Sequence, residues 1–271
     1  MPNSGNKLSI ILFRGLVFLT GLVVLLVATR TPSLDRTWDE DVNVLAGVDS
    51  STAETITLNK IRDWRYSDTA IIDKSYFDAA YNPNDIVAMW MYEQQLDATG
   101  LIAHTFVVFE FDDSYGPAKR LGLSVETRRE AGEKYSLLGG ILRKFEITHV
   151  WATERDLVTR RVQYLDYPLT RYRLEIPAAY HAEIFRKFVA ETRTLASQPR
   201  WYNTITNNCT SSLIKYVNNN EPGAIPLHYS FVFTGKMDEY LEKLGYKNAD
   251  YSLYITKEYL NSNIVFGASF P

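Results

Sequence analysis

The chain has 271 residues, 46% of them hydrophobic, and its 18 Tyr and 13 Phe are enough apolar material for a sizeable core. The formal net charge of -3 gives no electrostatic reason to expect binding to nucleic acid or to an anionic membrane. A single cysteine excludes an internal disulfide. The four histidines, at positions 104, 149, 181 and 228, are scattered, so we expect no metal ion and no other cofactor.

Residues 8–28 are apolar apart from a few small polar residues and Arg14, and the segment is long enough to span a bilayer as one helix. A signal peptide is the alternative, but Thr29-Arg-Thr-Pro32 is a poor cleavage site, and an uncleaved anchor is therefore favoured. The positive charges before this segment slightly favour a cytoplasmic N-terminus. The sequence thus predicts a single-pass protein of the inner (cytoplasmic) membrane, whose domain lies on the periplasmic side.

The remaining chain divides into two parts. Residues 30–58 are polar, with one Pro and several Asp, and predict a linker between the membrane segment (1–29) and a domain over residues 59–271. Within that domain, short runs rich in β-branched and aromatic residues predict strands. These runs are 61–66, 86–92, 102–111, 121–126, 145–152, 160–169 and 171–176.

Besides the helix at Cys209 described below, two helices are predicted after these strands, one over residues 177–196 and one within 235–247 that ends at Gly245. The turn sequence Asp112–Pro117 favours antiparallel pairing of the runs on either side of it. We therefore expect an α+β fold, with an antiparallel sheet and packed helices after one N-terminal transmembrane helix.

Cys209 lies in the run Asn207-Asn-Cys-Thr-Ser-Ser212, which is followed by apolar residues at helical spacing. Asn207, Asn208 and Thr210 are helix-capping residues, so the thiol is predicted in the first turn of a helix. There, unpaired backbone N–H groups and the helix dipole lower the pKa of a thiol. A buried, unreactive cysteine is the alternative, but such residues usually lie in apolar runs.

A thiolate nucleophile needs a base and a group that orients the base. His104, at the start of the strand 102–111, is the leading candidate base, and Glu126 is the candidate orienting group. A register that pairs Phe111 with Leu121 places His104 diagonal to Glu126 on one sheet face, whereas a shift by one residue would separate them. An ordinary strand histidine and a solvated glutamate are the alternatives. His228 is a weaker candidate base.

Four further residues are candidates for binding the substrate or the transition state. Asn207 and Asn208, with the backbone N–H of Cys209, would stabilise an oxyanion, although simple helix capping is the favoured role for at least one of them. Arg128 and Arg129 directly follow the strand that carries Glu126, and would bind a phosphate or carboxylate group. The alternative for this arginine pair is a solvated loop.

Four stretches, covering together about residues 60–245, resemble the N-terminal periplasmic domain of the Lnb-type bacterial lipoprotein N-acyltransferases, formerly a domain of unknown function. They are 103–109, 123–136, 150–156 and 202–210, and the most specific are the Ser-Val-Glu-x-Arg-x-Glu and Asn-x-x-x-Asn-Asn-Cys-Thr patterns. The resemblance implies a papain-like fold in permuted order, similar to NlpC/P60 and lecithin:retinol acyltransferase-like enzymes. It assigns Cys209 as nucleophile, His104 as base and Glu126 as orienting residue.

The activity that this resemblance implies is transfer of an acyl chain from a phospholipid to a lipoprotein amine through an acyl-cysteine thioester. The expected partners are therefore membrane lipid and a lipoprotein. The chain departs from the full-length acyltransferases, because no long apolar segment follows residue 29 here. Two alternatives remain open: a cysteine peptidase or amidase acting on cell-wall peptides, and a non-catalytic protein of envelope assembly.

Overall fold

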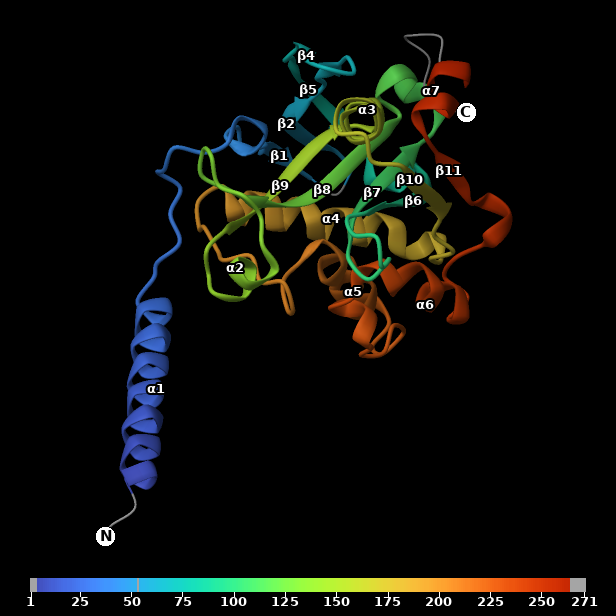
Figure 1. The fold of residues 1–271 in the computed structure, drawn as a ribbon. Coiled ribbons are helices and arrows are strands. Elements are labelled where there is room, and N and C mark those ends of the chain that lie inside the picture. The colour runs from blue at the N-terminus through green and yellow to red at the C-terminus, as the bar shows by residue number, and fades with distance from the viewer. Residues whose placement is uncertain (1–3, 53, 264–271) are drawn as a thin grey trace.

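The computed structural model of the chain describes residues 4–52 and 54–263, so the ends of the predicted ranges 1–29 and 59–271 lie outside the described residues. An N-terminal helix, α1, stands apart from an α+β domain in which helices cover both faces of a sheet (Figure 1). The strands are β1 (Gly47–Ser51), β2 (Ile56–Arg62), β3 (Arg65–Tyr66), β4 (Ile71–Asp73), β5 (Tyr76–Tyr81), β6 (Ile86–Gln95), β7 (Ala103–Phe111), β8 (Arg120–Arg128), β9 (Glu146–Thr153), β10 (Leu169–Arg173) and β11 (Leu253–Ile255). The helices are α1 (Ser4–Ala28), α2 (Leu137–Ile141), α3 (Glu154–Thr159), α4 (Ala178–Leu195), α5 (Cys209–Asn220), α6 (Met237–Lys243) and α7 (Lys257–Asn263).

The main sheet has nine strands among the described residues, in the order β1-β2-β9-β8-β7-β6-β10-β11, with β5 also paired to β2. Its central pairs are antiparallel, as the sequence predicts, but β2 and β9 run parallel, and the sheet is therefore mixed. Strands β3 and β4 form a separate two-stranded sheet. The central strands β7 and β8 carry His104 and Glu126, which places both residues on a rigid part of the fold.

Each face of the sheet has its own apolar core. Side chains such as Phe109 and Trp151 pack on one face against α4 and α5, through residues such as Phe185 and Leu213. On the other face, Phe106 and its neighbours pack against α3 and α7. The two-residue alternation of the strands produces this division, because successive side chains point to opposite faces.

Helix α1 contains the one segment in the described chain that is long and apolar enough to cross a membrane, Ser9–Ala28. Its mean hydropathy is 2.7, and none of that segment is buried against the domain. A helix of about 20 residues matches the thickness of a bilayer core. The helix and the domain after it therefore fit a single-pass membrane protein.

The segment 30–58, predicted as a linker, is largely folded onto the domain. Its second half forms β1 and the beginning of β2, in pairing with each other and with β5. Upstream, Trp38 forms a β-bridge with Glu130, and the Arg128 guanidinium donates to the carbonyl of Val42. The linker prediction was wrong here because a polar composition indicates only that side chains are exposed to solvent. The backbone of an exposed segment can still pair with a neighbouring strand, as it does here at the edge of the sheet.

The predicted strand over 160–169 was also wrong for its first half. Thr153 caps α3, and the chain continues into a π-helical turn, η4 (Arg160–Tyr164), before β10 begins at Leu169. An ion pair anchors α3, because the fully buried carboxylate of Asp156 accepts from the Arg62 guanidinium at 2.7 and 2.9 Å. This turn directs the side chain of Arg161 inward rather than along a sheet face.

Most of the other predicted elements are confirmed within small shifts of their ends. The runs 86–92, 102–111, 121–126 and 145–152 are β6, β7, β8 and β9, and the predicted helices are α4 and α6. Gly245 follows α6 with a positive φ of 79°, as expected for a residue that ends a helix. The runs at 61–66 and 171–176 are strands only in part, since β2 ends at Arg62 and β10 at Arg173.

Candidate active site

Cys209 is the first residue of α5, as its capping sequence predicts. Asn208 is the N-cap: its side chain accepts from the backbone N–H of Ser211, and the Ser211 hydroxyl accepts from the backbone N–H of Asn208. The backbone N–H of Cys209, in the first helical turn, has no acceptor within the helix. The residue is 8% exposed and lines a cleft. The thiol is thus shielded but reachable, at the positive end of a 12-residue helix.

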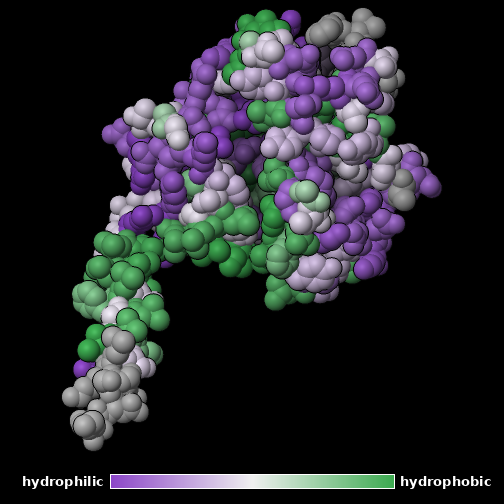
Figure 2. All heavy atoms as spheres, in the orientation of Figure 1, coloured by the Kyte–Doolittle hydropathy of each residue, from purple (hydrophilic) through white to green (hydrophobic). Residues whose placement is uncertain are grey.

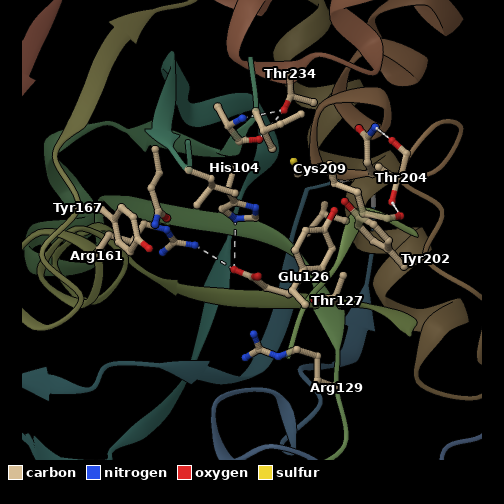
Figure 3. A pocket seen from close by; sticks show the side chains of 18 of the residues that line it. His104, Glu126, Thr127, Arg129, Arg161, Tyr167, Tyr202, Thr204, Cys209 and Thr234 are labelled. Carbon is tan, nitrogen blue, oxygen red and sulfur yellow. Dashed lines mark hydrogen bonds and ion pairs between the residues drawn. The ribbon is translucent and has the colours of Figure 1, made fainter. Parts of the chain in front are cut away.

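Cys209 and His104 approach each other although they come from different elements, α5 and the start of β7 (Figure 3). Burial alone would raise the pKa of the Cys209 thiol, but the charge of the His104 imidazole and hydrogen bonds from His104 and Thr105 outweigh it. Together they lower that pKa to about 7, from an ordinary value of 9.0. A large share of the thiol is therefore ionised at neutral pH, which is the reactive form.

The far side of the imidazole is held by a polar network, of which Figure 3 shows the contacts of Glu126 with His104 and Arg161. Nε2 of His104 lies 2.8 Å from the hydroxyl of Ser124 and 3.3 Å from Oε1 of Glu126. The Ser124 hydroxyl donates to the same carboxylate oxygen at 2.7 Å, and Nη2 of Arg161 donates to both groups at 3.0 and 2.9 Å. The carboxylate thus fixes the ring orientation and favours the protonated imidazole.

The pKa shifts of His104 and Glu126 agree with this geometry. Burial lowers the pKa of His104, but the nearby Glu126 carboxylate and Cys209 thiolate raise it overall to about 9. Burial raises the pKa of Glu126, but His104 and Arg161 hold it well below its ordinary value. Between about pH 7 and 9, the favoured state is therefore a thiolate beside an imidazolium.

The observed register explains how His104 and Glu126 meet. Phe109, rather than Phe111, pairs with Leu121, so the predicted register was wrong by two residues. A shift by two preserves the sheet face of every side chain. The two residues accordingly share a face as predicted, and continuing the pairing puts them directly opposite each other instead of on a diagonal.

The cleft beside the thiol has a volume of about 390 Å³ and is lined by both apolar and charged side chains. Its apolar side chains are suited to a hydrocarbon group, while Arg129 and Arg160 supply positive charge. Both guanidinium groups pair with the carboxylate of Asp41, which also lines the cleft. The apolar lining residues include Leu96, Ile102, Val125, Leu137, Leu165 and Val232.

Among the predicted binding residues, the structure brings Asn208 and Arg129 to the cleft. The Asn208 side-chain amide donates to the carbonyls of Thr204 and Phe231, so both of its hydrogens are used in holding the loop. Asn207 donates its amide to the carbonyl of Trp201. These partners favour capping and loop support over an oxyanion role for either side chain. The backbone N–H of Cys209 has no acceptor within the helix and stays the predicted oxyanion donor.

Arg128 does not contribute to the cleft as the structure describes it. Its guanidinium is buried, donates to the carbonyls of Val42 and Asn43, and lies 4.3 Å from the ring centre of Trp38. Burial lowers its pKa to about 10. The prediction that Arg128 binds substrate is therefore corrected: this arginine fastens the segment before β1 to the sheet.

The other three histidines lie away from the thiol. His149 is buried, its Nδ1 is 2.9 Å from the Thr192 hydroxyl, and burial lowers its pKa to about 3. His181 is bonded to the carbonyl of Ile176, and the ring of His228 stacks on Tyr240 at 3.8 Å. Among the described residues no group of three or more His, Cys, Asp or Glu side chains is arranged to hold a metal ion.

Sequence reasoning missed two members of the polar network, Ser124 and Arg161. Ser124 begins the Ser-Val-Glu-x-Arg-x-Glu pattern and lies two residues before Glu126, on the same face of the strand, but no role was assigned to it. A signal for Arg161 was present: Leu157, Val158, Arg161 and Val162 are buried and recur at helical spacing after the capping Thr153. Reading 160–169 as a strand concealed that pattern.

The ionisation of Cys209 can be tested by its alkylation rate. In the intact chain, the rate with iodoacetamide should rise with pH to half its maximum near pH 7, because thiolate forms above the lowered pKa. In a Glu126→Gln variant the imidazole pKa falls, so the thiol loses part of its positive neighbour, and the midpoint should move to higher pH. A midpoint at the ordinary value of 9.0 in the intact chain would contradict the described pairing.

Comparison with known proteins gives one match. The family model described as the Lnb N-terminal periplasmic domain matches residues 73–234, which include Cys209, His104 and Glu126. That range runs from the end of β4 to the residue before Gly235, and so contains the central strands and every lining residue of the cleft except Asp41. No curated protein and no solved structure gives a significant match.

Proposed function

Because this chain belongs to the family of Lnb N-terminal periplasmic domains, we propose that it is a membrane-tethered acyltransferase acting through an acyl-cysteine thioester. The observation that carries the proposal is the alignment of Cys209, His104 and Glu126, held by Ser124 and Arg161. We place the protein in the inner membrane by α1, with its domain in the periplasm. A permuted papain-like fold agrees with the order of a strand histidine before a helix cysteine.

The first half-reaction forms the thioester. The Cys209 thiolate attacks the carbonyl carbon of an acyl ester, and the resulting oxyanion accepts a hydrogen bond from the backbone N–H of Cys209. The C–O bond to the alcohol then breaks, and the His104 imidazolium gives its proton to the leaving alkoxide. Because Nε2 of His104 is held by Ser124 and Glu126, Nδ1 is the nitrogen that faces the reacting groups.

The second half-reaction releases the acyl chain. An amine attacks the thioester carbonyl, neutral His104 takes a proton from the attacking nitrogen, and the Cys209 thiolate leaves as the amide forms. The thiolate leaves readily because its pKa is already low. His104 thus returns to the imidazolium form and the cycle closes with no net change in the enzyme. Water in place of the amine would give hydrolysis.

A phospholipid is the acyl donor that best fits the cleft. The apolar lining is suited to a hydrocarbon chain, and a phosphate group would replace the carboxylate of Asp41 as the partner of Arg129 and Arg160. The neighbouring α1 would keep the cleft near lipid. A lipoprotein with a free N-terminal amine is the proposed acceptor, as in the activity implied by the family.

The proposal is tested with the full-length chain in vesicles that contain a phospholipid with a radiolabelled acyl chain and a lipopeptide with a free amine. We expect label to appear on the protein as a hydroxylamine-sensitive thioester and then on the peptide as an amide. Cys209→Ser should give neither product. Cleavage of cell-wall peptides without lipid turnover would contradict the proposal and favour an amidase. A Cys209→Ala strain that behaves normally beside a defective deletion strain would favour a non-catalytic role.

A further inference from the structure

Helix α2 exposes large apolar side chains on the outside of the domain. Leu137, Leu138 and Ile141 are 42%, 64% and 40% exposed, although they belong to a helix of only five residues. Ile205, which is 44% exposed, lies beside them because the Thr204 hydroxyl donates to the carbonyl of Leu137 at 3.0 Å. We call these four residues the α2 surface. Apolar side chains gathered in this way generally mark a surface that is covered in use.

The α2 surface lies at the end of α1. Directly after that helix, the Arg30 guanidinium donates to the carbonyls of Leu142 and Arg143, at 3.2 and 3.4 Å, and these residues immediately follow α2. Figure 2 shows apolar side chains running from α1 across the adjoining underside of the domain, whereas the parts farther from α1 are mostly polar. If α1 spans a bilayer, α2 is therefore held at the surface of the same bilayer.

Positive charge surrounds this junction. Arg30, Arg36, Arg143 and Lys144 line one hollow between the end of α1 and the domain, together with Glu130 and Glu133. Arg36 pairs with Glu130 and Lys144 with Glu133, so Arg30 and Arg143 supply the excess positive charge. Arginine and lysine side chains at the level of lipid headgroups interact favourably with phosphates. The combination of exposed apolar groups with adjoining cations is that of a segment lying in a membrane interface.

A second group of exposed apolar side chains adjoins the lining of the cleft. Val232 and Thr234 line the cleft, as Leu137 of the α2 surface does, and the segment 227–233 exposes apolar side chains. Leu227, Tyr229 and Phe233 are 89%, 56% and 41% exposed. We call these three residues the 227–233 edge. The amide of Asn208 donates to the carbonyl of Phe231, which ties this edge to the start of α5.

We propose that the α2 surface and the 227–233 edge dock on the bilayer that carries α1, so that the cleft containing Cys209 opens toward lipid. The partner is the lipid surface itself, because the hydrogen bonds of Arg30 hold the end of α2 beside the membrane helix of the same chain. A lipid ester then enters between the two apolar edges without leaving the membrane. This last step rests on the proposed function, whereas the docking does not.

Depth measurements test the docking directly. Since Cys209 is the sole cysteine in the sequence, a Cys209→Ser chain can carry one fluorophore at a chosen position. Labels are placed at Leu138→Cys, Leu227→Cys and, as a matched control, Ile72→Cys, which is 65% exposed on β4. The full-length chain is reconstituted at one copy per nanodisc. This loading prevents contact between copies.

We expect nitroxide-labelled lipids to quench the dyes at 138 and 227 several-fold more than the dye at 72, and aqueous iodide to show the opposite order. A dye at 138 or 227 as open to iodide as the one at 72 would overturn the proposal. If these apolar surfaces instead bind a soluble partner protein, which the nanodiscs do not contain, their dyes would remain open to iodide in this way.

A second experiment separates docking from chemistry. Leu138→Glu with Ile141→Glu should lower acyl transfer from bilayer lipid by about tenfold or more, because charged side chains oppose seating in the interface. The rate of Cys209 alkylation should stay as in the parent chain, and Ile72→Glu should change neither rate. Undiminished transfer in the double variant would contradict the inferred docking. If the parent chain transfers no acyl group, the proposed function fails, and the depth measurement still decides the docking.

Discussion

Replacement of His104 by alanine is expected to lower the rate of acyl transfer by about 10²- to 10⁴-fold, the usual contribution of a general acid–base group. The imidazole has two tasks that no neighbour can take over. It raises the thiolate fraction of Cys209, and it protonates the leaving alkoxide. In the variant, burial would still raise the pKa of the Cys209 thiol, but the positive charge of the imidazole would no longer lower it. The pKa of Cys209 should therefore rise above its ordinary value, and the alkylation midpoint should move accordingly.

The loss in this variant should be chemical rather than structural. The side chain of His104 is only 16% exposed, so its removal leaves a space into which imidazole can diffuse from the cleft. Added imidazole should restore part of the activity, and the thermal unfolding midpoint should change little. Unaltered transfer in His104→Ala would remove the histidine from the mechanism. A large fall in the unfolding midpoint with no rescue would make its role structural.

Replacement of Arg161 by methionine is expected to have the largest effect on stability, about 3–5 kcal/mol of unfolding free energy, because it leaves a partly buried carboxylate without its arginine partner. Arg161 is 1% exposed, and its Nη2 donates to Glu126 at 2.9 Å and to Ser124 at 3.0 Å. Its guanidinium also lies 4.6 Å from the ring centre of Phe106. Methionine approximately preserves the packing while removing the charge.

The pH dependence distinguishes this cause from a packing defect. The pKa of Glu126 is depressed in the folded chain, so its contribution to stability is present above its ordinary value of 4.5 and is lost as the pH falls below it. The stability difference between Arg161→Met and the parent should therefore be largest at neutral pH and shrink below about pH 4.5. Denaturant unfolding at several pH values measures it. A difference independent of pH would attribute the effect to packing alone.

A double variant supplies the control. Arg161→Met combined with Glu126→Gln removes both charges, and should recover much of the stability lost in the single variant. It should not recover the alkylation profile of the parent, because the imidazole of His104 would still lack its carboxylate. Recovery of both properties would show that the network supports folding without tuning the histidine.

The central residues of the site were predictable from local sequence. Capping residues before an apolar helical pattern placed Cys209 in the first turn of α5, and strand alternation placed His104 and Glu126 on one sheet face. Both inferences depend on periodicity, which survives an error of two residues in register. The approach of His104 to Cys209 was a hypothesis instead, because no local rule relates a strand to a helix about a hundred residues later.

The errors have a common physical origin in tertiary contacts. The segment 30–58 is polar, yet β1 lies in the sheet because its backbone pairs with β2. Arg161 was assigned to a strand because it lies in a run of β-prone residues, yet α3 and η4 turn it inward to meet Glu126. Arg128 and Arg129 are adjacent in sequence, but one fastens the chain before β1 while the other reaches the cleft. Amino-acid composition alone cannot show whether a polar segment is exposed or paired in a sheet, or whether an arginine lines a cleft or fastens a buried segment.

The most direct test of the account is the intact mass of the full-length chain after incubation with phospholipid vesicles and no amine acceptor. We predict one added acyl chain per protein, located on Cys209 by peptide mapping and removed by neutral hydroxylamine, with no adduct on Cys209→Ser. An unmodified Cys209 after incubation with phospholipid, or an acyl group that persists in the Cys209→Ser chain, would contradict the proposal that this thiol carries the acyl group.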